Sequence, residues 1–306
     1  MKKSFSSIIT ILKVWICVCW VSGCNVPSNR NGLLPAQYKA GVTDAFRAYW
    51  FSGKGEVNVY DLHHERYGED RKGSAVLVFV TEEFSKSKQV KLDDAASSDK
   101  VNVLKMNKLY HFNTGIYDYA MMESVFTPTD LAQGAHSLKA TVSVQDWCGQ
   151  VFMQLNFKNG KYKVQELSYF EKPGDKLTSM DGVLLEDDIL NRLRIQPESV
   201  PTGAIRLIPS LFYVRLKHQS MLPARANISF TDDKKKQRIC KIDYPDLKRT
   251  MEIWFDKDFP YKIQGWQEKS EEKLVSAGVL KKSLVTPYWE KNAEKFRYLR
   301  DSLGLK

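Results

Sequence analysis

The sequence lacks any long hydrophobic run. No apolar stretch within its 306 residues reaches 18 residues, the length that a membrane-spanning helix needs. It also lacks a strong compositional bias, since 43% of its residues are hydrophobic and 27% are charged, which excludes disordered and collagen-like chains. The nucleophile elbow, the phosphate-binding P-loop, His-Glu-x-x-His and Cys-x-x-Cys are all missing from it. These absences favour a non-enzymatic protein and leave open only a convergent active site built from scattered residues.

The first residues have the pattern of an export signal. A basic start at Lys2 and Lys3 precedes the apolar run 14–21, and small residues follow. The motif Val21-Ser22-Gly23-Cys24 resembles a bacterial lipobox, which implies that the Cys24 thiol carries a diacylglycerol and that residues 1–23 are removed. A non-cleaved amphipathic helix or an ordinary secreted precursor are the alternatives. We therefore predict a lipoprotein whose membrane partner is reached through acyl chains on Cys24, since several chains give stable anchoring.

The residues after Cys24 bear on localisation. By resemblance to the enterobacterial sorting rule, Asn25 in place of Asp favours the outer membrane, facing the periplasm, over the inner membrane. Removal of residues 1–23, which hold three Lys and no acidic residue, lowers the formal net charge from +10 to +7. We expect no nucleic-acid partner for an exported chain, and a modest attraction to anionic headgroups. Residues 24–36 are expected to form a flexible tether and residues 37–306 a single β-rich domain.

Two cysteines remain after the signal and the lipidated residue are set aside. Cys148 and Cys240 lie in strand-like runs far apart in the sequence. In an oxidising compartment they predict either a disulfide or two buried thiols, and the sequence leaves both outcomes open.

Period-two alternation dominates the rest of the chain. The clearest case is residues 151–157, followed by Asn159-Gly160 and residues 162–169, which predicts a hairpin with a type I′ turn. The alternation slips near Gln165, which predicts a β-bulge. Similar runs predict about a dozen strands in all. They are residues 56–62, 75–80, 101–110, 116–126, 140–145, 151–157, 162–169, 205–208, 211–216, 226–230, 239–244, 251–255, 260–266 and 273–284.

Helical spacing is confined to three segments. Residues 37–51 and 182–193 carry apolar residues every fourth position, and a C-terminal helix is expected after Thr286 and Pro287. The fold class is therefore mainly β, a large curved antiparallel sheet or incomplete barrel with a few peripheral helices. This arrangement resembles the LolA/LolB lipoprotein carriers in architecture. A curled sheet has a concave side that must be filled by the chain's own helix or by a ligand.

Candidate chemistry is sparse. His63-His64-Glu65 is the densest histidine site, but neighbouring side chains on a strand point to opposite faces, so we expect no metal site there. Asp187-Asp188 is expected to lie at a helix start and Asp256 and Asp258 in a turn. No cofactor is expected. The candidate pocket or core aromatics are Trp147, Trp254 and Trp266.

Several segments together resemble an uncharacterised family of Bacteroidetes-type lipoproteins. They are Ala48–Lys54, Gly73–Gln89, Phe112–Tyr117, Gln145–Gly149 and Thr286–Trp289. Members sometimes carry the label of septum formation inhibitor Maf, but the Ser-x-Ser-Pro-Arg-Arg phosphate loop of true Maf nucleotide pyrophosphatases is missing from this sequence. We therefore expect a non-enzymatic envelope lipoprotein that binds a hydrophobic ligand or lipid. The alternatives are a scaffold subunit of an envelope assembly, or an envelope hydrolase with a convergent site.

Overall fold

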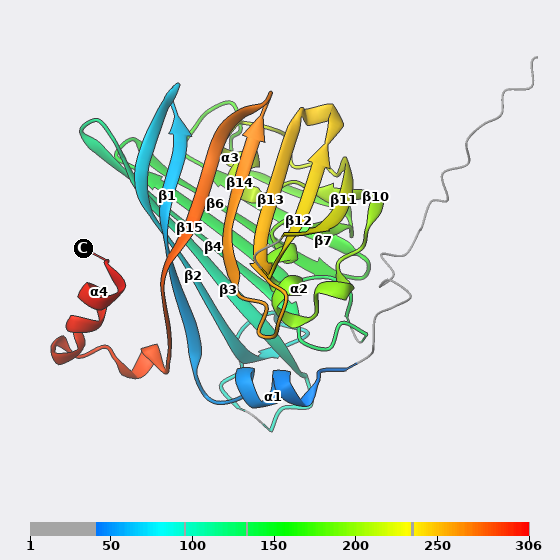
Figure 1. The fold of residues 1–306 in the computed structure, drawn as a ribbon. Coiled ribbons are helices and arrows are strands. Elements are labelled where there is room, and N and C mark those ends of the chain that lie inside the picture. The colour runs from blue at the N-terminus through cyan, green and yellow to red at the C-terminus, as the bar shows by residue number, and fades with distance from the viewer. Residues whose placement is uncertain (1–40, 95, 133, 234–235, 306) are drawn as a thin grey trace, which may run out of the picture. The chain divides into compact units, whose positions relative to one another are not determined.

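A computed structural model describes residues 41–94, 96–132, 134–233 and 236–305. These residues belong to one compact unit, and they form a mainly β structure with one sheet of fifteen strands (Figure 1). The predicted fold class is confirmed, because the sheet is large, curved and not closed into a barrel. The predicted signal, Cys24 and the tether lie outside the described residues.

The strands follow the period-two segments closely. In chain order they are β1 (Gly55–Arg66), β2 (Glu69–Ser85), β3 (Lys100–Thr114), β4 (Tyr117–Pro128), β5 (Lys139–Asp146), β6 (Gly149–Lys158), β7 (Lys161–Ser168), β8 (Lys176–Asp181), β9 (Leu184–Leu185), β10 (Gly203–Ile208), β11 (Ala224–Asp232), β12 (Gln237–Tyr244), β13 (Arg249–Asp256), β14 (Ile263–Ser270) and β15 (Lys273–Thr286). The helices are α1 (Asp44–Trp50), α2 (Asp188–Ile195), α3 (Leu211–Leu216) and α4 (Tyr298–Leu303), and the 3₁₀ turns are η1 (Pro197–Ser199), η2 (Pro245–Leu247), η3 (Tyr288–Glu290) and η4 (Glu294–Phe296). None of the helices within the described ranges is long and apolar enough to cross a bilayer.

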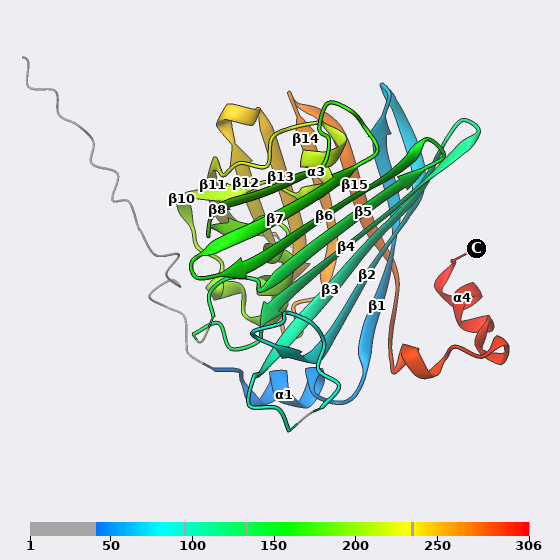
Figure 2. The same ribbon diagram turned by 180° about the vertical axis from the view of Figure 1, so that it is seen from behind.

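The order of the strands is that of two meanders joined by the chain's first and last strands. It runs β8-β7-β6-β5-β4-β3-β2-β1-β15-β14-β13-β12-β11-β10-β9, with β1 antiparallel to β15 and only β9–β10 parallel. The sheet curls, as long twisted sheets do, so that β7 and β8 lie across from β11 to β13 (Figures 1 and 2). The edge strands β8 and β9 are separated in sequence by Gly182 and Val183 alone.

The β6–β7 hairpin shows how the sequence sets the register. Asn159 and Gly160 have φ angles of 53° and 76°, which is the backbone that a type I′ turn requires, and this prediction is confirmed. The predicted bulge near Gln165 is wrong, because β6 and β7 pair without a register shift from Lys158↔Lys161 to Val151↔Ser168. The alternation continues with Glu166 and Ser168, two polar residues, on the side where apolar residues were expected.

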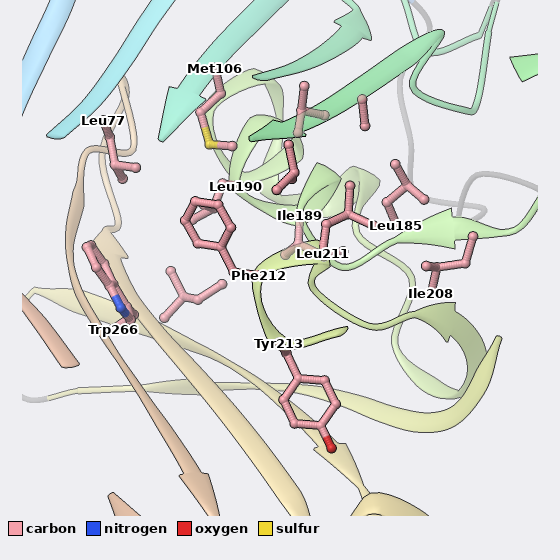
Figure 3. Close-up of a cluster of buried hydrophobic side chains, with 14 of the residues drawn as sticks. Leu77, Met106, Leu185, Ile189, Leu190, Ile208, Leu211, Phe212, Tyr213 and Trp266 are labelled. Carbon is pink, nitrogen blue, oxygen red and sulfur yellow. The ribbon is translucent and has the colours of Figure 1, made fainter. Parts of the chain in front are cut away.

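Two short helices fill most of the concave side. Side chains of α2 and α3, among them Ile189 and Phe212, lie near Met106 and Trp266 of the sheet (Figure 3). The sequence predicted a strand at 211–216, and the structure corrects this to α3. All six residues of α3 are buried, so no solvent-facing side gives the segment a helical period. The sequence alternatives for the concave side are therefore resolved largely in favour of the chain's own helices.

The C-terminal region covers the opposite, convex side. Leu303 of α4 packs in a small cluster with Val57, Val59, Val76 and Val78 from β1 and β2. A C-terminal helix is confirmed, but its predicted start is wrong. Thr286 is the last residue of β15, and 3₁₀ turns precede α4. Pairing with β1 as far as Gly55↔Thr286 holds this residue in the sheet.

Candidate functional site

Three consecutive acids at the start of α2 are buried, and each pairs with a different cation. Glu186 accepts two hydrogen bonds from Arg249, at 2.6 and 2.7 Å. Asp187 pairs with Lys108 at 3.0 Å, and Asp188 pairs with Arg192 at 2.6 Å. The predicted helix start at Asp187 and Asp188 is confirmed, because Asp187 is the N-cap of α2 and Asp188 its first residue. Both side chains are buried, and they bind partners from β3, β4 and α2.

A fourth pair ties the other end of α2 to β1. Arg194 donates to both carboxylate oxygens of Glu56, at 2.7 and 2.8 Å, a bidentate geometry that strengthens the pair. Its guanidinium also lies 5.0 Å from the ring centre of Trp50 and 4.8 Å from that of Phe79. Burial raises the pKa of Glu56, but Arg194 and the local hydrogen bonds outweigh it and lower this pKa to about 2. The pair is therefore a locked internal contact.

Lys108, Glu123 and Asp187 form a buried cluster of titratable groups, in which Lys108 pairs with both carboxylates. Burial, and then the nearby Asp187 carboxylate, raise the pKa of Glu123 well above its ordinary value. For Asp187 burial acts in the same direction, but Lys108 and hydrogen bonds outweigh it and lower the pKa to about 2. The cavity that Lys108 lines has a volume of only about 40 Å³, enough for about one water. Glu123 and Asp187 do not line this space, so the three groups form a closed internal cluster.

Arg215 on α3 behaves differently from the other buried cations. It is 9% exposed, and its Nε is buried without a hydrogen-bond partner. Among the described residues, no hydrogen bond or ion pair reaches its guanidinium, whose carbon lies 4.8 Å from the ring centre of Phe170. Burial, and then the positive charge of Arg66, lower the pKa of Arg215. This buried guanidinium therefore has no carboxylate at ion-pairing distance among the described residues, and the more distant charge of Asp146 acts to raise its pKa.

Arg215 lines a cavity of about 750 Å³ between α3 and the β6–β8 edge of the sheet. Val151 and Met153 of β6 supply its apolar floor, together with Met180 of β8 and Val214 of α3. The chain after α3, including Met221, covers part of it. The remaining lining residues are Glu166, Ser168, Lys172, Pro173, Lys176, Thr178, Ser179, His218, Gln219, Ser220 and Leu222. The cavity thus combines an apolar floor with a polar rim.

The location of the cavity follows from the strand directions. β6 begins and β7 ends at the cavity, at the end of the sheet where α3 lies, whereas α1 lies at the opposite end (Figures 1 and 2). His218 follows α3 at the rim, and burial, then Arg215 and Arg66, lower its pKa. The edge strand β8 forms one wall of the cavity.

The three candidate tryptophans do not meet in one site. Trp266 is buried in the core, with ring centres 4.9 Å from Tyr60 and 5.9 Å from Tyr110. Trp254 is half-buried, and Trp147 is 68% exposed in the β5–β6 turn, so its placement in a pocket or core is wrong. In this turn the ring centre of Trp147 lies 6.5 Å from that of Tyr117, which leaves most of the indole exposed. None of the three lines the cavity beneath α3.

The two cysteines within the described ranges, Cys148 and Cys240, are free thiols. Cys148 is exposed in the β5–β6 turn, whereas Cys240 is buried in β12, and burial raises the pKa of Cys240 to about 12. The disulfide between them is therefore not formed, because the β5–β6 turn and β12 lie far apart in the sheet order.

The histidine motif divides between the two faces of β1, as expected. His63 contacts Asp70 at 2.9 Å, while His64 is buried. Burial, and then Arg66, lower the pKa of His64 to about 4, so the imidazole is neutral at pH 7. Within the described ranges, no group of three or more His, Cys, Asp or Glu residues is placed to hold a metal ion.

Sequence reasoning missed the cavity, although one signal pointed to it. Glu166 and Ser168 interrupt the apolar alternation of β7 at the position where that strand borders the cavity. Arg215 carried no signal because the segment around it was interpreted as a strand. Comparison with known proteins adds no further identification: no protein-family model matches the chain, and no curated protein matches it. The resemblance to Bacteroidetes-type lipoproteins therefore stays a prediction.

Proposed function

We propose that this protein is an exported lipoprotein that binds an amphiphilic, lipid-like ligand in the cavity beneath α3. The observation that carries this proposal is the cavity itself, about 750 Å³ with an apolar floor and polar groups at the rim. Ligand sites in proteins commonly have volumes of roughly 300 to 1,000 Å³ and are lined mainly by apolar side chains with a few placed polar groups.

The composition of the floor suits a flexible apolar chain. Met153, Met180 and Met221 all line the cavity, and methionine adapts its shape to irregular apolar partners. The rest of the concave side is closed by α2 and α3 (Figure 3). The proposal therefore concerns one end of the sheet, and a carrier that encloses its ligand along the whole concave side is not part of it.

The proposed setting is the bacterial envelope. The lipobox resemblance at Cys24 supports anchoring by acyl chains, and Asn25 supports the outer membrane facing the periplasm. Replacing Cys24 by Ser is expected to release the protein from the membrane fraction after cell lysis. A variant that still pellets with membranes would contradict the anchor, without bearing on the cavity.

Ligand binding can be tested by filling the cavity from β8. Thr178 lines the cavity, whereas its neighbour Leu177 is 81% exposed and is not among the lining residues. We expect Thr178→Trp to abolish binding of dodecanol in calorimetric titration, and Leu177→Trp to leave it unchanged. Equal binding by both variants, or no binding by the unmodified protein, would overturn the proposed function. Isolation from cells with a stoichiometric protein and no amphiphile would favour the scaffold alternative.

A further inference from the structure

We infer that the ligand is an anionic amphiphile, whose head group pairs with the guanidinium of Arg215 while its apolar chain lies on the floor of the cavity. This inference rests on the proposed function and adds the charge and the position of the head group to it.

The first argument is that the other buried cations of the molecule are paired with carboxylates. Four other Lys or Arg side chains are buried in the described part of the chain, and each has a carboxylate within 3.0 Å; they are Lys108, Arg192, Arg194 and Arg249. A buried charge without a partner costs several kcal/mol. Arg215 has no such carboxylate, yet it lines a space large enough for one to be supplied from outside.

The second argument is the positive neighbour of Arg215. Arg66 donates to the Tyr119 hydroxyl at 3.1 and 3.2 Å and to the carbonyl of Leu216 at 3.2 Å. These acceptors are uncharged, so they satisfy its hydrogen bonds without neutralising its charge. Within the described ranges, Arg66 forms no ion pair with a carboxylate. Two neighbouring guanidinium groups thus share a local excess of positive charge, which attracts an anion.

One carboxylate does line the cavity, and it does not serve as the missing partner. Glu166 is a partly buried residue of β7 that shares the cavity with Arg215, and no ion pair joins the two. Its carboxylate would compete with an anionic ligand for the guanidinium of Arg215. Removing its charge is therefore expected to help an anion and not to hinder it.

The guanidinium geometry defines the chemical class of the head group. Its N–H groups form a planar fork that matches the two oxygens of a carboxylate or a phosphate. A fatty carboxylate and an alkyl phosphate both provide this oxyanion, and a free inorganic anion provides it without an apolar chain. The shared chemistry is an oxyanion, and the apolar floor favours the forms that carry a chain.

The experiment uses mature protein produced without its lipid anchor and probes of one chain length. Dodecanoate and dodecyl phosphate carry the oxyanion, dodecanol carries a neutral head, and inorganic phosphate carries no chain. In calorimetric titration we expect the two anionic probes to bind about tenfold or more tightly than dodecanol, and inorganic phosphate to bind more weakly than dodecyl phosphate.

Variants then assign the effect to one side chain. Arg215→Met is expected to reduce the affinity for both anionic probes to that for dodecanol, and to leave dodecanol binding unchanged, whereas Arg215→Lys retains part of the preference. Lys176→Met removes one positive charge from an exposed rim position of the same cavity and should change anion affinity by less than about twofold. Glu166→Gln should tighten anion binding or leave it unchanged.

The outcomes separate this inference from the function on which it rests. Tight dodecanol binding with no anionic preference, or an anionic preference that survives in Arg215→Met, would overturn the head-group assignment and leave the amphiphile site in place. Absence of binding by every probe with an apolar chain would overturn the proposed function. Equal affinity for inorganic phosphate and dodecyl phosphate would support an anion site at Arg215 and contradict an amphiphile as its occupant.

Discussion

The two short helices on the concave side treat buried charge in opposite ways. Around α2, every buried cation faces a carboxylate, as Arg194 faces Glu56. On α3, Arg215 is buried with no carboxylate at ion-pairing distance among the described residues. The α2 pairs lie in the packed core, whereas Arg215 borders the cavity of about 750 Å³. This difference is the one we expect if the α2 charges stabilise the sheet and the α3 charge pairs with the ligand that we propose.

His64 shows a third way in which a buried ionisable side chain can be accommodated. It lacks a partner at Nδ1, but its lowered pKa keeps it neutral. An arginine cannot follow this route, because its guanidinium stays protonated in proteins. The comparison therefore isolates Arg215 as the one buried side chain, among those described as cationic at neutral pH, whose charge is not balanced internally.

The largest expected effect comes from breaking a paired cation. Arg194→Met leaves Glu56 buried without its partner and should lower the free energy of unfolding by about 3 to 5 kcal/mol, measured by urea unfolding at pH 7. The double variant Arg194→Met with Glu56→Gln removes the unpaired charge and should recover part of this loss. A loss below about 1 kcal/mol in the single variant would show that the pair is not needed for the structural role assigned to it.

The next effect is the dependence of stability on pH through His64. Because folding lowers its pKa from 6.5 to about 4, the contribution is fully present above pH 6.5 and is lost as pH falls toward 4. We expect a loss on the order of 2 to 3 kcal/mol over this window. Urea unfolding at a series of pH values measures this loss, and His64→Phe should reduce the slope of the unfolding free energy against pH. His136 and His218, whose pKa values are also lowered by burial, remain in both proteins and account for the residual slope. An unchanged slope would refute the buried neutral imidazole.

A smaller effect of opposite sign is expected at Arg215. Arg215→Met removes an unbalanced buried charge, so the ligand-free protein should gain on the order of 1 kcal/mol in unfolding free energy. Adding dodecyl phosphate should raise the melting temperature of the unmodified protein and leave that of the variant unchanged. A loss of stability comparable to that of Arg194→Met would erase the contrast between the two helices.

The smallest effect is expected at Glu123. Its raised pKa favours the protonated form, which glutamine imitates in shape and charge. Glu123→Gln should change the unfolding free energy by less than about 1 kcal/mol. Asp187→Asn, which removes the carboxylate that balances Lys108, should cost several times more. Urea unfolding of both variants at pH 7 measures this difference. Equal losses of unfolding free energy would show that Glu123 is also ionised.

The local sequence pattern predicted most of the fold but little of the candidate site. The hairpin at Asn159-Gly160 was predictable because the backbone of a two-residue turn depends on those two residues. The helix α3 was not predictable, because a segment buried on every side has no polar face to show its period. The pair of Arg194 and Glu56 joins residues 138 positions apart, and no spacing rule connects them.

The cavity was partly predictable from the sequence. Glu166 and Ser168 stood out in β7 as departures from alternation, which local reasoning explained by a bulge. The departure instead reflects a change in what the strand faces, from packed core to cavity. A polar residue at an inward position is therefore informative about function when the register around it is regular.

The pairing of β1 with β15 has a consequence for how the chain reaches this structure. Gly55 lies opposite Thr286, so the central seam of the sheet joins segments from nearly opposite ends of the domain. Closing so large a loop costs chain entropy before any contact is gained, which slows folding. Each meander can form from neighbouring segments, but they become one sheet only after β15 has been synthesised, so a chain cut short before Lys273 leaves the inner edge of each half exposed to pairing with other molecules.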